Sequence, residues 1–313
     1  MSDNLSVSYA PHIRKDRYIS TTMRDVIIAL VPAIAGSVYF FGMKALIITA
    51  LCAASCVASE YIWNKACGKP TSIGDLSAVV TGILLAMTLP PNVPYYIPVV
   101  GGVFAIIIVK CFFGGLGQNI VNPALASRAF LLASWPVAMT TWGMDALSAA
   151  TPLALLKEGR ENLPNLLDLF LGTNIEGCIG EVSALLLLIG GVYLIVRKVI
   201  TPVIPLTYLI TLGIFGFVFN PSGLFQGDFL FSVLSGGAVL AGFFMATDYT
   251  TSPLTAKGQF VYAFGAAVIT GVIRTYGGYP EGATYGILIM NIVTPLIDKA
   301  IVPKTFGKAV KSK

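Results

Sequence analysis

Residues 203–219 read VIPLTYLITLGIFGFVF, an apolar run without a charged side chain. As a helix that rises about 1.5 Å per residue, such a run crosses most of the ~30 Å hydrocarbon core of a membrane. The composition agrees, since 56% of the 313 residues are hydrophobic, 11% are charged and the mean hydropathy is +0.81. These values exclude an ordinary soluble globular protein and predict an integral membrane protein.

Similar apolar runs recur along the whole chain, separated by short polar links. A membrane β-barrel would instead show alternating segments of about ten residues, so the runs predict helices. The expected fold class is therefore all-α, with ten transmembrane helices. These cover residues 26–42, 45–62, 76–89, 96–113, 123–139, 182–196, 203–219, 229–245, 259–273 and 283–297. Several are short for a span of about 20 residues, so some are expected to be broken or re-entrant.

The lysines and arginines are distributed unevenly between the loops. Most of them fall in the two tails and in every second link, so the positive-inside rule places both termini in the cytoplasm. The same rule explains the net charge of +5, which gives no reason to expect a nucleic acid as a partner. The long loop of residues 140–181, with its excess of acidic residues, is then external. The basic residues expected outside are Lys44, Lys157, Arg160 and Arg274.

The two halves of the chain also resemble each other. The first half contains, in order, residues 86–91 (AMTLPP), Lys110, Gly114-Gly115 and Asn122-Pro123. The second half contains, in the same order, residues 245–248 (MATD), Arg274, Gly277-Gly278 and Pro280-Glu281. Because five spans per half is an odd number, the two copies must have opposite orientations in the membrane. Such inverted repeats are common in transporters, so a small-solute channel or transporter is one alternative function.

These observations predict five parts of the chain. They are a cytoplasmic tail (1–25), a first five-helix repeat (26–139), an external loop (140–181), a second five-helix repeat (182–298) and a basic cytoplasmic tail (299–313). No metal site is expected, because His12 is the single histidine and the five cysteines form no CxxC pair.

The external loop carries the sequence DALSAATPL at residues 145–153. A serine three residues before a threonine, followed by proline, is by itself typical of a helix N-cap with proline at the first helical position. The hydroxyl of Thr151 in a loop of small residues is also a suitable acceptor for a covalent group. The local sequence favours the cap, and only other parts of the chain can favour the modification.

Three blocks together resemble a known family. They are residues 114–131, residues 145–153 and residues 244–298, which include FMATDYTTSP and YPEG. The chain resembles the RnfD family, whose members are the D component of the Rnf ferredoxin:NAD oxidoreductase. That family is related to NqrB, a component of the sodium-translocating NADH:quinone reductase. The shorter N-terminal tail favours the Rnf form over the quinone-reductase component, which remains an alternative.

The resemblance implies an enzyme activity held as one component of a translocase in the bacterial inner membrane. Electrons would pass between ferredoxin and NAD through a flavin in this chain, coupled to the movement of Na⁺ or H⁺. The implied partners are the other components of the Rnf complex, RnfA, RnfB, RnfC, RnfE and RnfG, together with membrane lipid.

In that family, a threonine in a D-x-x-S-G-A-T motif is joined to FMN through a phosphoester bond. Carried onto this sequence, the acceptor is Thr151, with Ser148 in place and Asp145 slightly further upstream. Ala149 stands where glycine is usual, and the loop is still expected to leave the threonine hydroxyl accessible. A rival Gly-Ala-Thr sequence ends at Thr284, which we expect inside the first turn of the last helix instead.

Two amide side chains, Asn119 and Asn122, lie three residues apart at the inner start of a helix. Amides can hydrogen-bond the imide edge of a flavin ring, and the relationship to the quinone reductase implies a second, non-covalent riboflavin near them. The alternative is that Asn122 only caps the helix opened by Pro123. Arg128, inside the same span, is expected to pair with a phosphate or a partner carboxylate.

A charge at the centre of a bilayer costs about 3 kcal/mol or more, so acidic residues there should be paired or functional. Asp248 and Glu281 occupy the two breaks of the second half and are the candidates for a cation path. The alternative is that they cap helices or pair with Lys257 or Arg274.

Overall fold

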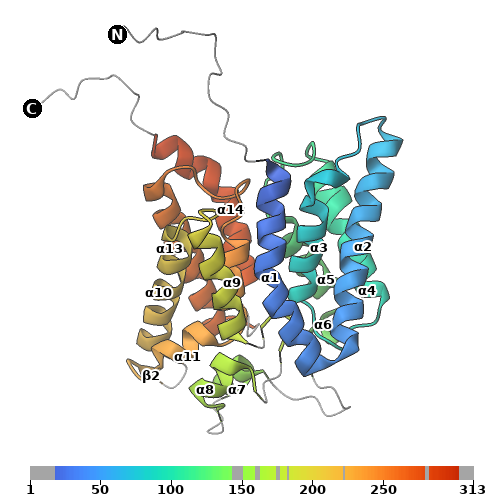
Figure 1. The fold of residues 1–313 in the computed structure, drawn as a ribbon. Coiled ribbons are helices and arrows are strands. Elements are labelled where there is room, and N and C mark those ends of the chain that lie inside the picture. The colour runs from blue at the N-terminus through green and yellow to red at the C-terminus, as the bar shows by residue number, and fades with distance from the viewer. Residues whose placement is uncertain are drawn as a thin grey trace, which may run out of the picture.

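A computed structural model describes residues 18–142, 151–158, 163–173, 177–181, 183–220, 223–278 and 282–302. It is a bundle of helices, most of which run along one common direction (Figure 1). The first helix begins and the last helix ends at the same end of the bundle, which we call the terminal end. Two short helices, α7 and α8, lie at the opposite end, which we call the loop end.

Helices overlap every stretch that was expected to span the membrane. The first half contains α1 (Ile19–Phe41), α2 (Met43–Ala66), the 3₁₀ turn η1 (Ile73–Asp75), α3 (Ser77–Met87), α4 (Tyr96–Val103), the π-helix η2 (Phe104–Cys111), α5 (Pro123–Ser134) and α6 (Pro136–Thr140). Between the halves lie α7 (Pro152–Lys157) and α8 (Leu166–Leu171). The external segment expected as a loop therefore contains helices.

The second half contains α9 (Ala184–Val196), α10 (Val203–Val218), the strands β1 (Phe219–Asn220) and β2 (Gly223–Leu224), α11 (Phe229–Leu234), α12 (Ala238–Leu240), the π-helix η3 (Ala241–Met245), α13 (Ala256–Tyr276) and α14 (Ala283–Ala300). The two strands form one antiparallel hairpin. Of the described helices, α1, α2 and α13 are long and apolar enough to cross a membrane. Shorter apolar helices include α3, α9 and α10.

The first helix begins at Ile19, earlier than the expected residue 26. The sequence prediction assigns Arg24 and Asp25 to the cytoplasmic tail. In the structure Asp25 is buried, and its carboxylate accepts hydrogen bonds from Arg197 at 3.3 Å and from the Tyr193 hydroxyl at 3.3 Å. Partners at the end of α9, Tyr193 in its last turn and Arg197 at its C-cap, therefore allow α1 to include this charge.

Two expected spans are broken rather than continuous. The fifth stops at Trp135, because Pro136 cannot donate the backbone hydrogen bond that would continue α5. The eighth is divided at residues 235–237, where Gly236 has a φ of +62°. Leu76, directly before α3, has the same φ of +62°. This left-handed conformation suits glycine and is uncommon for leucine, so the start of α3 is an unusual feature of the chain.

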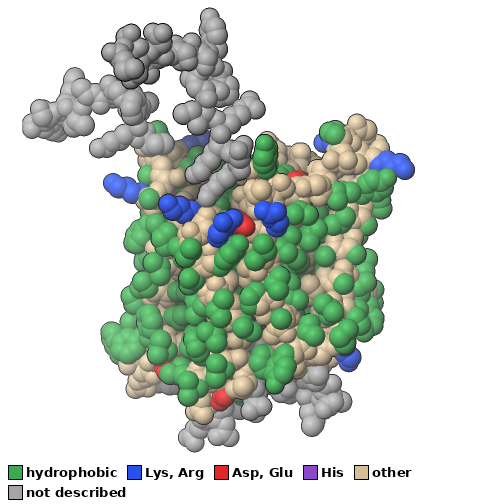
Figure 2. Space-filling view, viewed as in Figure 1, with side chains coloured by type: hydrophobic (Ala, Val, Ile, Leu, Met, Phe, Trp, Pro, Cys, Tyr) green, Lys and Arg blue, Asp and Glu red, His purple; other side chains and the backbone are tan. Residues whose placement is uncertain are grey.

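Small residues bring the main helices into close contact. Gly190 of α9 lies against the backbone of Ala29 in α1, and a Cβ at Gly82 of α3 would lie 2.6 Å from the Cα of Ala53 in α2. Membrane helices use such small residues because the apolar lipid gives them little hydrophobic drive to associate. Hydrophobic side chains cover the middle of the visible face, and most of its lysines and arginines gather toward the terminal end (Figure 2). This surface is the one expected of a membrane protein.

Candidate functional site

Thr151 is the N-cap residue of α7. Its Oγ1 accepts a hydrogen bond from the backbone N–H of Ala154 at 3.3 Å, and Pro152 occupies the first helical position. The cap interpretation is therefore confirmed. The expected accessibility is not found, since Thr151 is only 4% exposed. The two other residues of the motif, Asp145 and Ser148, lie outside the described residues.

Thr151 is buried because α7 packs into the loop end of the bundle. Leu153 forms a small apolar cluster with Leu169 of α8 and Phe231 of α11. Leu153 also lies close to Gly236, at the break between α11 and α12. A Cβ added at Gly236 would lie 2.6 Å from the Cδ1 of Leu153. The sequence around Thr151 gives no sign of these contacts, because each comes from a distant segment.

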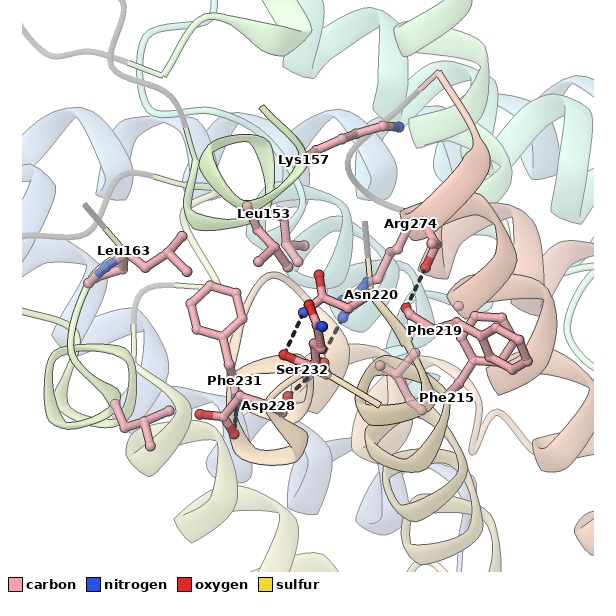
Figure 3. A pocket seen from close by; sticks show the side chains of 18 of the residues that line it. Leu153, Lys157, Leu163, Phe215, Phe219, Asn220, Asp228, Phe231, Ser232 and Arg274 are labelled. Carbon is pink, nitrogen blue, oxygen red and sulfur yellow. Dashed lines mark hydrogen bonds between the residues drawn. The ribbon is translucent and has the colours of Figure 1, made fainter. Parts of the chain in front are cut away.

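A cavity of about 320 Å³ opens beside α7, and we call it the α7 pocket. Leu153, Leu156 and Lys157 of α7 form one wall, while segments of α8, α10, α11 and α13 form the others. Figure 3 shows Phe215, Phe219 and Phe231 among its lining side chains. Its volume lies at the lower end of the range of about 300–1,000 Å³ that is usual for small-molecule sites.

A fixed positive charge borders this pocket. The Arg274 guanidinium, labelled in Figure 3, donates hydrogen bonds to the carbonyl oxygens of Ser232 at 2.8 Å and Ser235 at 3.2 Å, at the break after α11. Asp228 also lines the pocket, but its carboxylate caps α11 by accepting from the N–H groups of Leu230 at 2.8 Å and Phe231 at 3.2 Å. These two backbone carbonyls tie the guanidinium to the break after α11.

At the terminal end, Asn122 caps α5, as the simpler interpretation predicted. Its Oδ1 accepts from the N–H groups of Ala124 at 3.0 Å and Leu125 at 3.3 Å. Its Nδ2 also donates to the carbonyl of Met245 at 3.1 Å, which joins α5 to the end of η3. Both hydrogen-bonding atoms of this amide are therefore occupied.

The other members of this polar cluster come from α13 and α14. With the Asn291 amide oriented so that its oxygen accepts from the Asn122 N–H at 3.1 Å, its nitrogen lies 2.7 Å from the Tyr262 hydroxyl. Asn119 is buried, and its Nδ2 donates to the carbonyl of Val121 at 3.1 Å. The structure thus brings together the two predicted amides and adds Tyr262 and Asn291, which sequence reasoning missed.

Asp248 lies in the turn after η3, near this cluster. Its carboxylate accepts from the Thr250 hydroxyl at 3.1 Å and from the Thr250 N–H at 3.3 Å. Burial raises the pKa of Asp248, while hydrogen bonds from Thr250, Asn119 and Thr251 oppose that rise. Of the alternatives, a pair between Asp248 and Arg274 is not found, because Arg274 lies in the last turn of α13 and Asp248 lies before the start of that helix. The other candidate, Glu281, lies outside the described residues.

Arg128 is found beside a carboxylate of its own chain. Its Nη1 lies 3.7 Å from Oε1 of Glu181, and its Nη2 lies 3.4 Å from the Cys178 sulfur. Glu181 is buried at the end of the segment that precedes α9. The expected carboxylate partner is therefore internal to the chain.

Lys110 and Glu60 form a second buried ion pair, which the sequence did not predict. The Lys110 ammonium lies 3.0 Å from both carboxylate oxygens of Glu60 and donates to the Ser77 hydroxyl at 2.7 Å. Both charged side chains are almost completely buried, with exposures of 3% and 4%. The sequence did contain one sign of this pair. Glu60 and Lys110 each occur in an apolar helix, at positions expected near the same membrane surface.

The comparisons with known proteins cover nearly the whole chain. The NQR2, RnfD, RnfE family matches residues 6–307. The D component of the Na⁺-translocating ferredoxin:NAD⁺ oxidoreductase complex from Acetobacterium woodii is 53% identical over 97% of this chain and 96% of that protein. The D component of the proton-translocating ferredoxin:NAD⁺ oxidoreductase complex from Clostridium ljungdahlii is 47% identical, with 96% of each chain covered.

A more distant relative has a broader name. The D component of the ion-translocating oxidoreductase complex from Halorhodospira halophila is 39% identical over 95% of this chain and 94% of that protein. All three relatives are therefore similar to this chain over nearly their full lengths. The chain belongs to the NQR2, RnfD, RnfE family.

Proposed function

We propose that this chain is the D component of an ion-translocating ferredoxin:NAD⁺ oxidoreductase in the bacterial inner membrane, with both termini cytoplasmic. The other components of that complex would be its partners. The full-length similarity to relatives that carry this name supports the proposal. The relatives include both Na⁺-translocating and proton-translocating complexes, so either ion fits.

The redox cofactor in this proposal is FMN, joined to Thr151 by a phosphoester bond. The observation that carries the assignment is the position of Thr151 at the start of the helix that forms one wall of the α7 pocket. The Thr151 oxygen would bond to the flavin-side phosphorus of a flavin dinucleotide. The pyrophosphate bond would break, a nucleoside monophosphate would leave and the hydroxyl proton would pass to solvent.

The burial of Thr151 adds a condition to this step. An enzyme that transfers the flavin needs access to a side chain that is 4% exposed once α7 is packed. The attachment would therefore occur before α7 docks, or while it is displaced. The ester oxygen can still accept the Ala154 N–H bond afterwards, so the cap and the flavin link are compatible.

We further propose that the helices form two inverted five-helix repeats. A residue with a φ of +62° lies in each third span, Leu76 directly before α3 in one half and Gly236 between α11 and α12 in the other. A basic side chain from the following span contacts residues beside each of them, Lys110 at Ser77 and Arg274 at Ser232 and Ser235. This correspondence supports a repeat.

Two further assignments belong to the same proposal. A non-covalent riboflavin would bind near Asn119 and Asn122, where the buried amide of Asn119 is the more available of the two. Asp248 and Glu281 would belong to a cation path. Asp248 is supported by its oxygen-rich surroundings, since the Thr250 hydroxyl lies 3.1 Å from each of its carboxylate oxygens.

A denaturing gel viewed under ultraviolet light tests the flavin link. We expect the wild-type chain to fluoresce after denaturation and Thr151→Ala to be dark. Thr284→Ala is the matched control, because Thr284 is a buried threonine in the first turn of α14 and should keep the fluorescence. Fluorescence that persists in Thr151→Ala would contradict the assignment. A dark wild-type chain from a host with the transferase would favour a channel or transporter.

A further inference from the structure

We propose that the β1–β2 hairpin anchors the loop end of the bundle in the membrane, with Leu224 and Phe225 at the boundary between the acyl chains and the headgroups. The partner that this surface fits is therefore phospholipid. The hairpin lies at the loop end, beyond the end of α10 (Figure 1). The inference needs only that the chain spans a membrane, so it does not depend on a flavin or on the proposed complex.

The first argument is the length of α10. Its 16 residues rise roughly 24 Å as a helix, which is less than the ~30 Å hydrocarbon core of a bilayer. The hairpin follows α10 directly, and residues 199–227 contain no charged side chain. Helix and hairpin together therefore form one uncharged unit that is longer than α10 alone.

The second argument is the continuity of the exposed surface. The exposed side chains of α10 are all apolar and share one face of the helix, at spacings of three and four residues. They are Leu206, Ile210, Ile214 and Phe217. The Phe225 ring lies against Phe217, with 6.2 Å between the ring centroids and 69° between the ring planes. Because Leu224 and Phe225 are 65% and 64% exposed, the hairpin continues this apolar face toward the loop end.

The third argument concerns the backbone. The last carbonyl groups of a helix have no partner within the helix, and an unsatisfied polar group is costly in contact with lipid. In the hairpin, the Phe225 N–H donates to the carbonyl of Val218 at 2.9 Å, and the Gly227 N–H donates to the carbonyl of Phe217 at 3.2 Å. Gly227 also lies directly against the backbone of Gly216. The hairpin thus satisfies the end of α10 while its own apolar side chains stay exposed.

Water is a poor environment for this surface. A two-stranded hairpin alone is at best marginally stable in water, and exposed apolar residues on an edge strand favour aggregation. Phe225 also has a φ of +60°, a left-handed conformation that costs a bulky residue energy and that glycine adopts freely. Contact of its ring with Phe217 and with lipid would offset that cost.

The anchor would also set the depth of the α7 pocket. Phe219 and Asn220 of β1 line that cavity, and so does Gln226, just after β2. The Asn220 amide donates to the Gln226 carbonyl at 3.2 Å, which joins the two sides of the hairpin. A hairpin fixed at the lipid boundary would therefore hold this wall of the cavity at the membrane surface.

Photo-crosslinking in the native membrane complex tests the contact. p-Benzoylphenylalanine is introduced in place of Phe225, and the irradiated chain is digested for mass spectrometry. We expect a phospholipid adduct, as for the same label in place of Ile210 on the exposed face of α10. Leu167 of α8 is the control, since it is 72% exposed at the loop end and should give several-fold less lipid adduct. A protein adduct at position 225, no lipid adduct there, or equal lipid labelling at position 167 would overturn the inference.

Bilayer thickness gives a second test that needs no label. The double variant Leu224→Ser with Phe225→Ser and the control Leu167→Ser are compared after reconstitution of the complex in short-chain and long-chain phosphatidylcholine. A thin bilayer matches α10 alone, whereas a thick bilayer also requires the hairpin. The fall in the unfolding midpoint of the double variant should be several-fold larger in the thick bilayer, while the control should not depend on thickness. Equal falls of the double variant in both bilayers would overturn the inference.

Discussion

Lys110 and Arg274 are basic side chains that lie near opposite ends of the molecule, and their surroundings differ. Lys110 is 3% exposed and contacts the Glu60 carboxylate and the Ser77 hydroxyl. Arg274 is half-buried, donates to two backbone carbonyls and borders the α7 pocket. The first cation is paired with a carboxylate inside the protein, and the second is hydrogen-bonded to backbone carbonyls beside a cavity.

This difference indicates which of the two cations lies where a ligand could contact it. In a buried ion pair, each charge already interacts with the other. The cost of desolvating the two charges offsets much of the favourable energy of that interaction. The Arg274 guanidinium joins α13 to the break after α11 and also lines a cavity. Lys110 therefore has a structural role inside the protein, while Arg274 combines a structural role with a place in the lining of a cavity.

Removal of Lys110 should have the largest effect on stability. Lys110→Met leaves the buried Glu60 carboxylate without its compensating charge, which typically costs about 3–5 kcal/mol. Thermal unfolding of the purified chain in detergent should show a large fall in midpoint, together with poor yield from membranes.

The double variant Lys110→Met with Glu60→Gln serves as the control. Removing both charges eliminates the uncompensated carboxylate, so the double variant should be more stable than Lys110→Met alone. If the losses of the two single variants simply add, the two side chains do not stabilise each other and the comparison with Arg274 fails.

Removal of Arg274 should have a smaller effect. Arg274→Met loses two charge-assisted hydrogen bonds, to Ser232 and Ser235, each of a kind worth about 1.5–3 kcal/mol. Water in the adjacent pocket can satisfy the two carbonyls, so the loss should stay below that of Lys110→Met. Lys44→Met is the control, since Lys44 is exposed and surface charges contribute about 0–1 kcal/mol. A loss of stability in Arg274→Met as large as that in Lys110→Met would show that the two cations have the same purely structural role.

Much of this organisation could be predicted from local sequence. Apolar runs located the helices, and Asn122-Pro123 and Thr151-Pro152 predicted two caps that the structure contains. Caps are local, because the capping side chain bonds the backbone two or three residues away. The start of α1 was placed too late for the converse reason, since Asp25 is compensated by Arg197, far along the chain.

The pocket could not be predicted in the same way. Its walls come from α7, α8, α10, α11 and α13, and no pattern in any one segment shows that these meet. The burial of Thr151 depends on the same distant contacts, which is why its accessibility was predicted wrongly. Pairing between Lys110 and Glu60 also required the fold, because 50 residues separate them.

The smallest expected effect concerns Asp248, which tests whether the terminal end also holds a group that responds to pH. Burial raises the pKa of Asp248 above the ordinary aspartate value of about 3.9, so the folded chain retains a proton that the unfolded chain has lost. The free energy of unfolding should therefore fall as the pH rises from that ordinary value through the raised pKa. Asp248→Asn should remove this decline in unfolding measurements across that range.

Thr250 provides the discriminating variant. Its hydroxyl donates to the Asp248 carboxylate and so favours the ionised form. Thr250→Val should therefore raise the pKa further and extend the decline to higher pH, whereas Asp248→Asn should abolish it. If both variants instead follow the wild-type pH dependence, the carboxylate does not titrate in this range. The terminal end would then contain only fixed charges, and the contrast with the loop end would rest on Arg274 alone.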